Sequence, residues 1–122
     1  GFPNLFVVGF SQAANLISNV PHNLVEAGRT VAAMVKHAVD IDADEVEVTA
    51  EAEQAWIDRL KAGDRRFAAD PDCTPGYYNN EGQPDETASQ IGGLGFPEGP
   101  VAYFQYIEQW RTSGDFLGLE FR

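Results

Sequence analysis

Two segments of the chain carry residue types that could hold a planar, electron-rich ligand. The first begins with the apolar run Leu5–Val8, turns at Gly9, and leads through Ser18 and Asn19 into a helical pattern. A strand, a glycine turn and a helix start together aim backbone N–H groups and the positive end of the helix dipole at one point. This arrangement predicts contact with an anionic or electron-rich group. An ordinary strand-to-helix turn is the alternative.

The second segment, Cys73–Gly82, combines aromatic and amide side chains within a few residues. Tyr77 and Tyr78 could stack on a flat ligand, while Asn79 and Asn80 could hydrogen-bond to amides or ribose hydroxyls. The alternative is a structural turn whose tyrosines pack back onto the domain. Composition alone leaves both interpretations open.

No self-contained catalytic motif accompanies these segments. The sequence contains no G-x-G-x-x-G, no P-loop and no G-x-S-x-G elbow. His22 and His37 have no carboxylate or cysteine at a metal-ligand spacing, so no metal site is expected. Cys73 lies near Asp70 and Asp72, whose negative charge disfavours a thiolate. We therefore expect no catalytic residue within this chain.

The first half of the chain predicts a strand followed by a long helix. Asn4–Gly9 is apolar throughout, which is typical of a fully buried strand. Because no partner strand precedes it, we expect the rest of its sheet to lie elsewhere, in a larger enzyme. Asn19 as N-cap and Pro21 in the first turn predict a helix to about Val39. The apolar positions of this helix share one face: Leu24, Val31, Val35 and Ala38.

The second half predicts two more helices and two short strands. Glu45–Thr49 alternates as a short strand or extended linker does. Thr49 can cap a helix that ends near Ala62, with an apolar stripe of Trp56, Ile57 and Leu60. Val101–Thr112 predicts a helix with an aromatic face formed by Tyr103, Tyr106, Ile107 and Trp110. Phe116–Phe121 predicts a last strand.

Residues 70–100 hold five of the seven prolines and read as a long loop. A loop of this length in a compact domain is usually functional or mobile. The predicted fold class is therefore α/β or α+β, built from helices with few short strands.

Composition narrows the possible partners. The formal net charge of −11 argues against nucleic acid and against an anionic membrane surface. Cys73 is the one cysteine, which excludes an internal disulfide and favours a reducing, cytoplasmic location. No apolar run approaches the ~20 residues that span a bilayer. A start at Gly1 without methionine suggests a processed or truncated chain.

Three segments in order resemble flavin-dependent Baeyer–Villiger monooxygenases. GFPNLF at Gly1–Phe6, followed by an elbow and Asn19, is similar to the C-terminal part of that family. Glu47–Trp56 resembles its glutamate-rich helix that ends in tryptophan. CTPGYYNNEG at Cys73–Gly82 is similar to the version found in enzymes that oxidise large cyclic ketones and steroids. The resemblance covers nearly the whole chain.

This resemblance implies an enzyme in which NADPH reduces FAD and oxygen is inserted next to a ketone, giving an ester or lactone. Both dinucleotide sites would lie upstream, so the isolated chain is expected to bind neither cofactor. The chain's partners would be the rest of its own enzyme and a small-molecule ketone. The implied cofactor-binding residues are Gly9, Phe10, Ser11, Val20, Thr74, Asn79 and Asn80. The implied substrate pocket is lined by Leu16, Ile17, Tyr77 and Tyr78, together with Val20.

The family also implies how the segment divides. Residues 1–40 would end the FAD domain as strand, elbow and helix, residues 41–69 would be helical, residues 70–100 would form a mobile loop, and residues 101–122 would form the last helix and strand. This chain departs from many members at Gly9–Ser11, where they have Gly-Pro, and at Thr74–Pro75, where they have Trp-Tyr. Two alternatives stay open: a free-standing acidic interaction module, and a segment of a flavin enzyme that oxidises nitrogen or sulfur.

Overall fold

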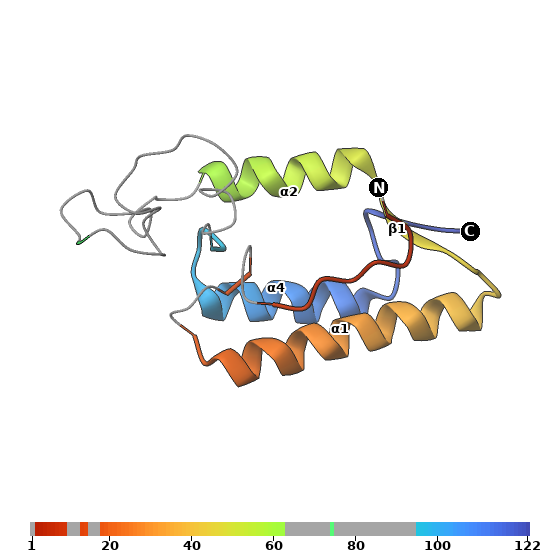
Figure 1. The fold of residues 1–122 in the computed structure, drawn as a ribbon, viewed down its shortest axis with the longest axis horizontal. Helices are drawn as coiled ribbons and strands as arrows, with labels where there is room; N and C mark the ends of the chain where they lie inside the picture. Colours follow the sequence, from red (N-terminus) through yellow and green to blue (C-terminus); the bar gives the residue numbers. More distant parts are fainter. Residues whose placement is uncertain (1, 10–12, 15–17, 63–73, 75–94) are drawn as a thin grey trace.

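The structure, a computed structural model, describes residues 2–9, 13–14, 18–62, 74 and 95–122. Within these residues the chain forms α1 (Val20–Asp40), β1 (Val46–Val48), α2 (Ala50–Ala62), α4 (Pro100–Ser113) and β2 (Leu119–Phe121). Figure 1 shows a helix-rich arrangement with a small sheet at one end. The prediction of helices with few short strands is confirmed.

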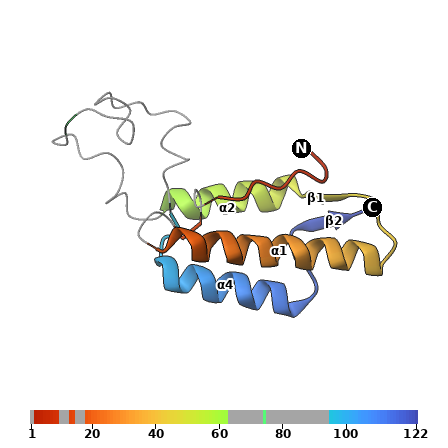
Figure 2. The ribbon, with the colours of Figure 1, turned by 60° about the horizontal axis from the view of Figure 1, so that its bottom comes forward.

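The three helices lie roughly along one direction. α1 and α4 run side by side in the same sense, and α2 runs in the opposite sense (Figures 1 and 2). The sheet lies where α1 ends and α2 begins. Its strands are antiparallel, with Val46 opposite Phe121 and Val48 opposite Leu119. This arrangement brings the C-terminal strand back to the connection between the first two helices.

Local signals in the sequence account for the limits of α1. The side chain of Asn19 accepts a hydrogen bond from the N–H of His22 at 3.1 Å, which satisfies one of the open donors of the first turn. Pro21 occupies the first turn, where no partner for its missing N–H is needed. At the other end, the N–H of Ile41 donates to the carbonyl of His37. The predicted cap and extent of this helix are confirmed.

The limits of α2 and α4 also follow from their end residues. Thr49 Oγ1 accepts from the N–H of Ala52 at 3.1 Å and caps α2 as predicted. The predicted stripe of α2 faces inward, and Leu60 is fully buried. Gly114 ends α4 in the left-handed conformation, at φ 78°, which glycine adopts without a steric penalty.

An aromatic cluster joins α2 to α4. The rings of Trp56 and Tyr106 stack at 6.1 Å, and Phe96 lies 5.7 Å from Tyr103 and 5.6 Å from Tyr106. At the sheet end, Phe116 is buried and packs 4.8 Å from His37 and 5.9 Å from Phe121. The predicted aromatic face of α4 is confirmed, and the predicted last strand is shorter because Phe116 turns inward before it.

The prediction of a buried strand at Asn4–Gly9 is wrong. Residues 2–9 contain no strand, and Leu5 and Val7 are 62% and 89% exposed. A strand needs a neighbour that pairs with its backbone along its length. In the described part of the chain, β1 pairs with β2, and the segment reaches β1 through hydrogen bonds of Asn4 and not through a strand ladder. The apolar run therefore lies extended across the helices without a ladder.

The predicted inward face of α1 is also wrong in part. Leu24 and Val35 are exposed, whereas Asn23 and Glu26 are buried. One residue along a helix turns the side chain by about 100°, so Leu24 points well away from its neighbour Asn23. α1 packs on α4 through a polar stripe because Arg111 of α4 offers a partner for that stripe. The apolar stripe is left outside this contact.

Candidate functional site

The start of the chain is fixed to β1 by one asparagine. Asn4 adopts φ 61°, a left-handed conformation that asparagine tolerates better than most residues. Its N–H donates to the carbonyl of Val46, its side-chain oxygen accepts from the N–H of Val46, and its side-chain nitrogen donates to the carbonyl of Asp44. These bonds set where the GFPNLF segment leaves the sheet and how it crosses α1.

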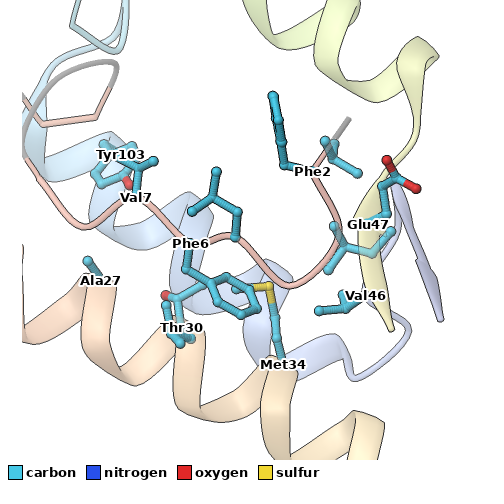
Figure 3. Close-up of a pocket in the computed structure, with 13 residues that line it drawn as sticks. Phe2, Phe6, Val7, Ala27, Thr30, Met34, Val46, Glu47 and Tyr103 are labelled. Atoms are coloured by element: carbon cyan, nitrogen blue, oxygen red, sulfur yellow. The ribbon is translucent and has the colours of Figure 1, made fainter. Parts of the chain in front are cut away.

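Between this segment and α1 lies an apolar groove of about 320 Å³ (Figure 3). Phe6 and Val7 line it from the segment, and Thr30 and Met34 line it from α1. Val46 and Glu47 of β1 form its far end in Figure 3. The lining is mostly hydrophobic, as expected of a site for apolar groups.

The start of α1 carries a second arrangement with chemical capacity. Asn23 is 3% exposed, and its side-chain nitrogen donates to Ser18 Oγ and to the carbonyl of Asn19. Its side-chain oxygen is buried and has no hydrogen-bond partner among the residues that the structure describes. The first turn contains no acidic residue, so nothing there offsets the positive end of the helix dipole. This end of α1 is therefore suited to an electron-rich group.

Three of the predicted site residues lie in the described part of the chain. Gly9 is half-buried, and a Cβ added there would meet no described atom within 4 Å. Val20 is half-buried at the first position of α1, beside the cap, and Thr74 is exposed. The structure thus places Val20 at the helix start.

The other predicted residues lie outside the described residues. Among the implied cofactor contacts these are Phe10, Ser11, Asn79 and Asn80. Among the implied pocket residues they are Leu16, Ile17, Tyr77 and Tyr78. Their roles remain predictions, as do those of Cys73 and the residue 70–94 part of the predicted mobile loop.

A contact that the sequence did not predict ties the elbow to α2 and α4. The N–H of Phe96 donates to the carbonyl of Ala13 at 2.8 Å, and both residues are buried. Arg59 lies over the ring of Phe96 at 4.3 Å and also pairs with Glu98. The sequence offered one signal for this contact, which is the aromatic residue Phe96 within a stretch of glycines and prolines. Its partner, distant in sequence, could not be read from the pattern.

A buried ion pair joins α1 to α4 near the groove. Both terminal nitrogens of Arg111 lie 3.1 Å from Glu26 Oε2, and Arg29 holds the other carboxylate oxygen. Burial alone would raise the pKa of Glu26, but hydrogen bonds from Arg111 and Arg29 and their charges outweigh it, so the pKa is lowered. Burial, with the charge of Glu26, raises the pKa of Tyr103.

Two further properties concern the described residues only. Within them, no group of three or more histidine, cysteine, aspartate or glutamate side chains is placed to hold a metal ion. No helix in the described ranges is both long and apolar enough to cross a bilayer.

Comparison with known proteins gives the family. The chain is 34% identical over 124 residues to the FAD-binding monooxygenase hmp7 of Hypomyces subiculosus, a match that covers 98% of the chain and 20% of that protein. It is 34% identical to Baeyer–Villiger monooxygenase 4 of a Dietzia species, covering 99% of the chain and 19% of that protein. The chain is a segment of a protein of the Baeyer–Villiger and FAD-binding monooxygenase family. No family model matches the sequence.

A solved structure of this Baeyer–Villiger family has the same fold. The polycyclic ketone monooxygenase of the fungus Thermothelomyces thermophila superposes with a TM-score of 0.81 at 32% identity, over 100% of this chain and 20% of that one. The chain therefore spans about a fifth of the length of its relatives. The family relationship favours a segment of a larger enzyme over a free-standing acidic module.

Proposed function

We propose that this chain is the C-terminal part of an FAD- and NADPH-dependent monooxygenase that inserts oxygen next to a ketone, giving an ester or lactone. The observation that carries the proposal is the match along the whole chain to Baeyer–Villiger and polycyclic ketone monooxygenases. Those names also support a large cyclic ketone as the substrate class. The single cysteine supports a cytoplasmic location.

The residues at the start of α1 fit one edge of a flavin. A Cβ built at Gly9 would meet no described atom within 4 Å, which is compatible with close approach of a flat ring, and the first turn of α1, which contains no acidic residue, favours electron-rich atoms. The side-chain nitrogen of Asn23 donates to Ser18 Oγ and to the carbonyl of Asn19, and these hydrogen bonds fix the two residues that precede α1. No dinucleotide fingerprint is present in the sequence, so the phosphates would be bound by the remainder of the enzyme.

FAD, reduced by NADPH, supplies the oxygen chemistry in this family. The work of this chain is to bind and orient. Gly9, Phe10, Ser11 and Val20 would line the flavin side, while Leu16 and Ile17 would form an apolar wall for the ketone. Tyr77 and Tyr78 would stack on substrate or nicotinamide, and Thr74, Asn79 and Asn80 would hydrogen-bond to the nicotinamide cofactor. The division of the chain into residues 1–40, 41–69, 70–100 and 101–122 is part of the same proposal.

The full-length enzyme provides the test. It should purify yellow, oxidise NADPH faster when a polycyclic ketone is added, and give a product heavier by one oxygen atom. The isolated chain should show no flavin absorbance after mixing with FAD and gel filtration. A flavin-loaded enzyme that oxidises amines or sulfides but no ketone would instead support the nitrogen- or sulfur-oxidising alternative. A full-length enzyme that binds no flavin would contradict both.

A further inference from the structure

The elbow, residues 10–18, joins the N-terminal segment to α1. In the proposed function its first residues line the flavin side, and Leu16 and Ile17 form a wall for the ketone. Ala13 and Ala14 lie between these two groups in the sequence, and they are 8% and 2% exposed. Alanine has no polar side chain that could fix its own position. The placement of the elbow therefore depends on what holds the backbone at these two residues.

A backbone hydrogen bond from Phe96 holds this point. The N–H of Phe96 donates to the carbonyl of Ala13 at 2.8 Å. Phe96 is 6% exposed, so donor and acceptor both belong to buried residues. A buried backbone group that loses its partner is costly, so the elbow follows Phe96 wherever that residue is fixed. The carbonyl of Phe96 accepts from the N–H of Gly99, directly before α4.

Side chains from two helices hold the ring of Phe96. From α2, the ring of Trp56 lies 5.8 Å from it between centroids, and the guanidinium carbon of Arg59 lies 4.3 Å from its centroid. From α4, the rings of Tyr103 and Tyr106 lie 5.7 Å and 5.6 Å from it. Neighbouring rings and a cation over a ring face attract one another at these separations. The ring of Phe96 is thus fixed by α2 and α4 together.

Arg59 is itself held in place over the ring. Its guanidinium carbon lies 4.9 Å from the ring centroid of Tyr106, and its Nη2 lies 3.0 Å from Oε1 of Glu98. This cluster lies at the end of the bundle where α1 and α4 begin and α2 ends (Figures 1 and 2). One residue, Phe96, therefore connects the elbow to the ends of two helices.

We propose that Phe96 is a positioning residue of the monooxygenase, which sets the placement of the elbow against flavin and ketone through its hydrogen bond to Ala13. Ser11 and Leu16 lie two and three residues from Ala13, so a shift of Ala13 is passed to both. A displacement of about 1 Å at reacting groups can cost roughly 100-fold in rate. The inference rests on the proposed function, because only there do the residues of the elbow meet the reactants.

Matched alanine variants of the full-length enzyme test this role. Phe116 is the control, because it is 4% exposed and packs on His37 at the sheet end of the bundle. Phe96→Ala and Phe116→Ala should both lower Tm. Per bound flavin, Phe96→Ala should also lower kcat for ketone oxidation several-fold and raise the share of NADPH lost as hydrogen peroxide several-fold, whereas Phe116→Ala should change neither. Phe96→Leu, which keeps an apolar side chain, should recover most of both. Equal kinetic effects of the two alanine variants would overturn the proposal.

Hydrogen exchange of the same enzymes, read by mass spectrometry, measures the anchor without turnover. Exchange in peptides that contain Ala13 and Ala14 should be several-fold faster in Phe96→Ala than in the wild type, and unchanged in Phe116→Ala. Unchanged exchange in Phe96→Ala would overturn the proposal. So would faster exchange with unaltered kcat and peroxide release, since Phe96 would then support the fold alone.

Arg59→Met gives a milder test, which decides the matter if Phe96→Ala does not fold. The Arg59 side chain is 37% exposed, and its loss removes the cation over the ring but leaves the ring in place. Peroxide release should rise more than in Arg122→Met, whose arginine is 51% exposed and pairs at the sheet end; equal release would overturn the proposal. Faster elbow exchange in Phe96→Ala of an enzyme that oxidises no ketone would contradict only the proposed function. An active enzyme whose elbow exchange and coupling are insensitive to Phe96 would contradict only the positioning role.

Discussion

Arg111 of α4 places both of its terminal nitrogens 3.1 Å from Oε2 of Glu26 in α1. The side chains are only 14% and 9% exposed, so this ion pair lies inside the contact between the two helices. One of the same nitrogens also lies 3.3 Å from Thr30 Oγ1. The pair fixes which side of α1 faces α4, and with it the outward direction of the exposed side chains of Leu24 and Val35.

Replacing Arg111 with methionine should destabilise the chain. Loss of a charged partner leaves a buried carboxylate less well satisfied, which costs about 1–3 kcal/mol. Chemical denaturation of the purified chain measures this free energy. Lys36→Met is the matched control, because its pair with Asp40 is exposed and such pairs contribute about 0–1 kcal/mol. Equal losses of unfolding free energy in the two variants would show that the buried ion pair contributes no more to stability than the exposed one.

The same pair predicts a dependence of stability on pH. The folded state lowers the pKa of Glu26 through Arg111 and Arg29, against the opposing effect of burial, so the folded protein binds that proton less readily than the unfolded chain. The stabilisation is therefore fully present above the ordinary glutamate pKa of about 4.3, and it is lost as pH falls through the lower folded pKa. Thermal unfolding between neutral and acidic pH should show a smaller loss for Glu26→Gln than for the wild type. Parallel curves would contradict this.

Gly118→Ala should be destabilising for two separable reasons. Gly118 has φ 93°, where a side chain costs about 1–2 kcal/mol, and its added Cβ would lie 2.9 Å from the Cβ of Ala52. Gly114→Ala provides the control, because Gly114 has φ 78° and no described atom within 4 Å of the added Cβ. The denaturation midpoint should therefore fall further for Gly118→Ala than for Gly114→Ala. The difference between the two midpoints measures the close contact between Ala52 of α2 and Gly118, which directly precedes β2.

Asn79→Ala or Asn80→Ala in the full-length enzyme should raise the KM for NADPH or increase release of hydrogen peroxide without ketone oxidation. Removing one hydrogen bond costs about 0.5–1.5 kcal/mol, so the change should be several-fold and not complete. Steady-state kinetics with both substrates and a peroxide assay give the result. Unchanged kinetics and coupling in both variants would return residues 73–82 to the interpretation of a structural turn.

The caps could be predicted from the sequence because each depends on atoms a few residues apart. Asn19 bonds to His22 and Thr49 bonds to Ala52, so a helix start can be recognised from a short window. The family resemblance was equally readable, since it rests on three short motifs in order. Asn4 was visible as part of GFPNLF, but its role was not, because its partners are Asp44 and Val46.

The sequence by itself determined where the three helices begin and end, and which family the chain resembles. Only the tertiary structure decided which side of α1 faces inward, and that the N-terminal run lies across α1 without forming a strand. The reason is that these choices depend on partners far away in the chain: Arg111 for Glu26, Phe96 for Ala13 and Val46 for Asn4. An apolar stripe in the sequence indicates that one side of a helix is suited to burial, and only the folded arrangement shows whether another part of the same chain buries it.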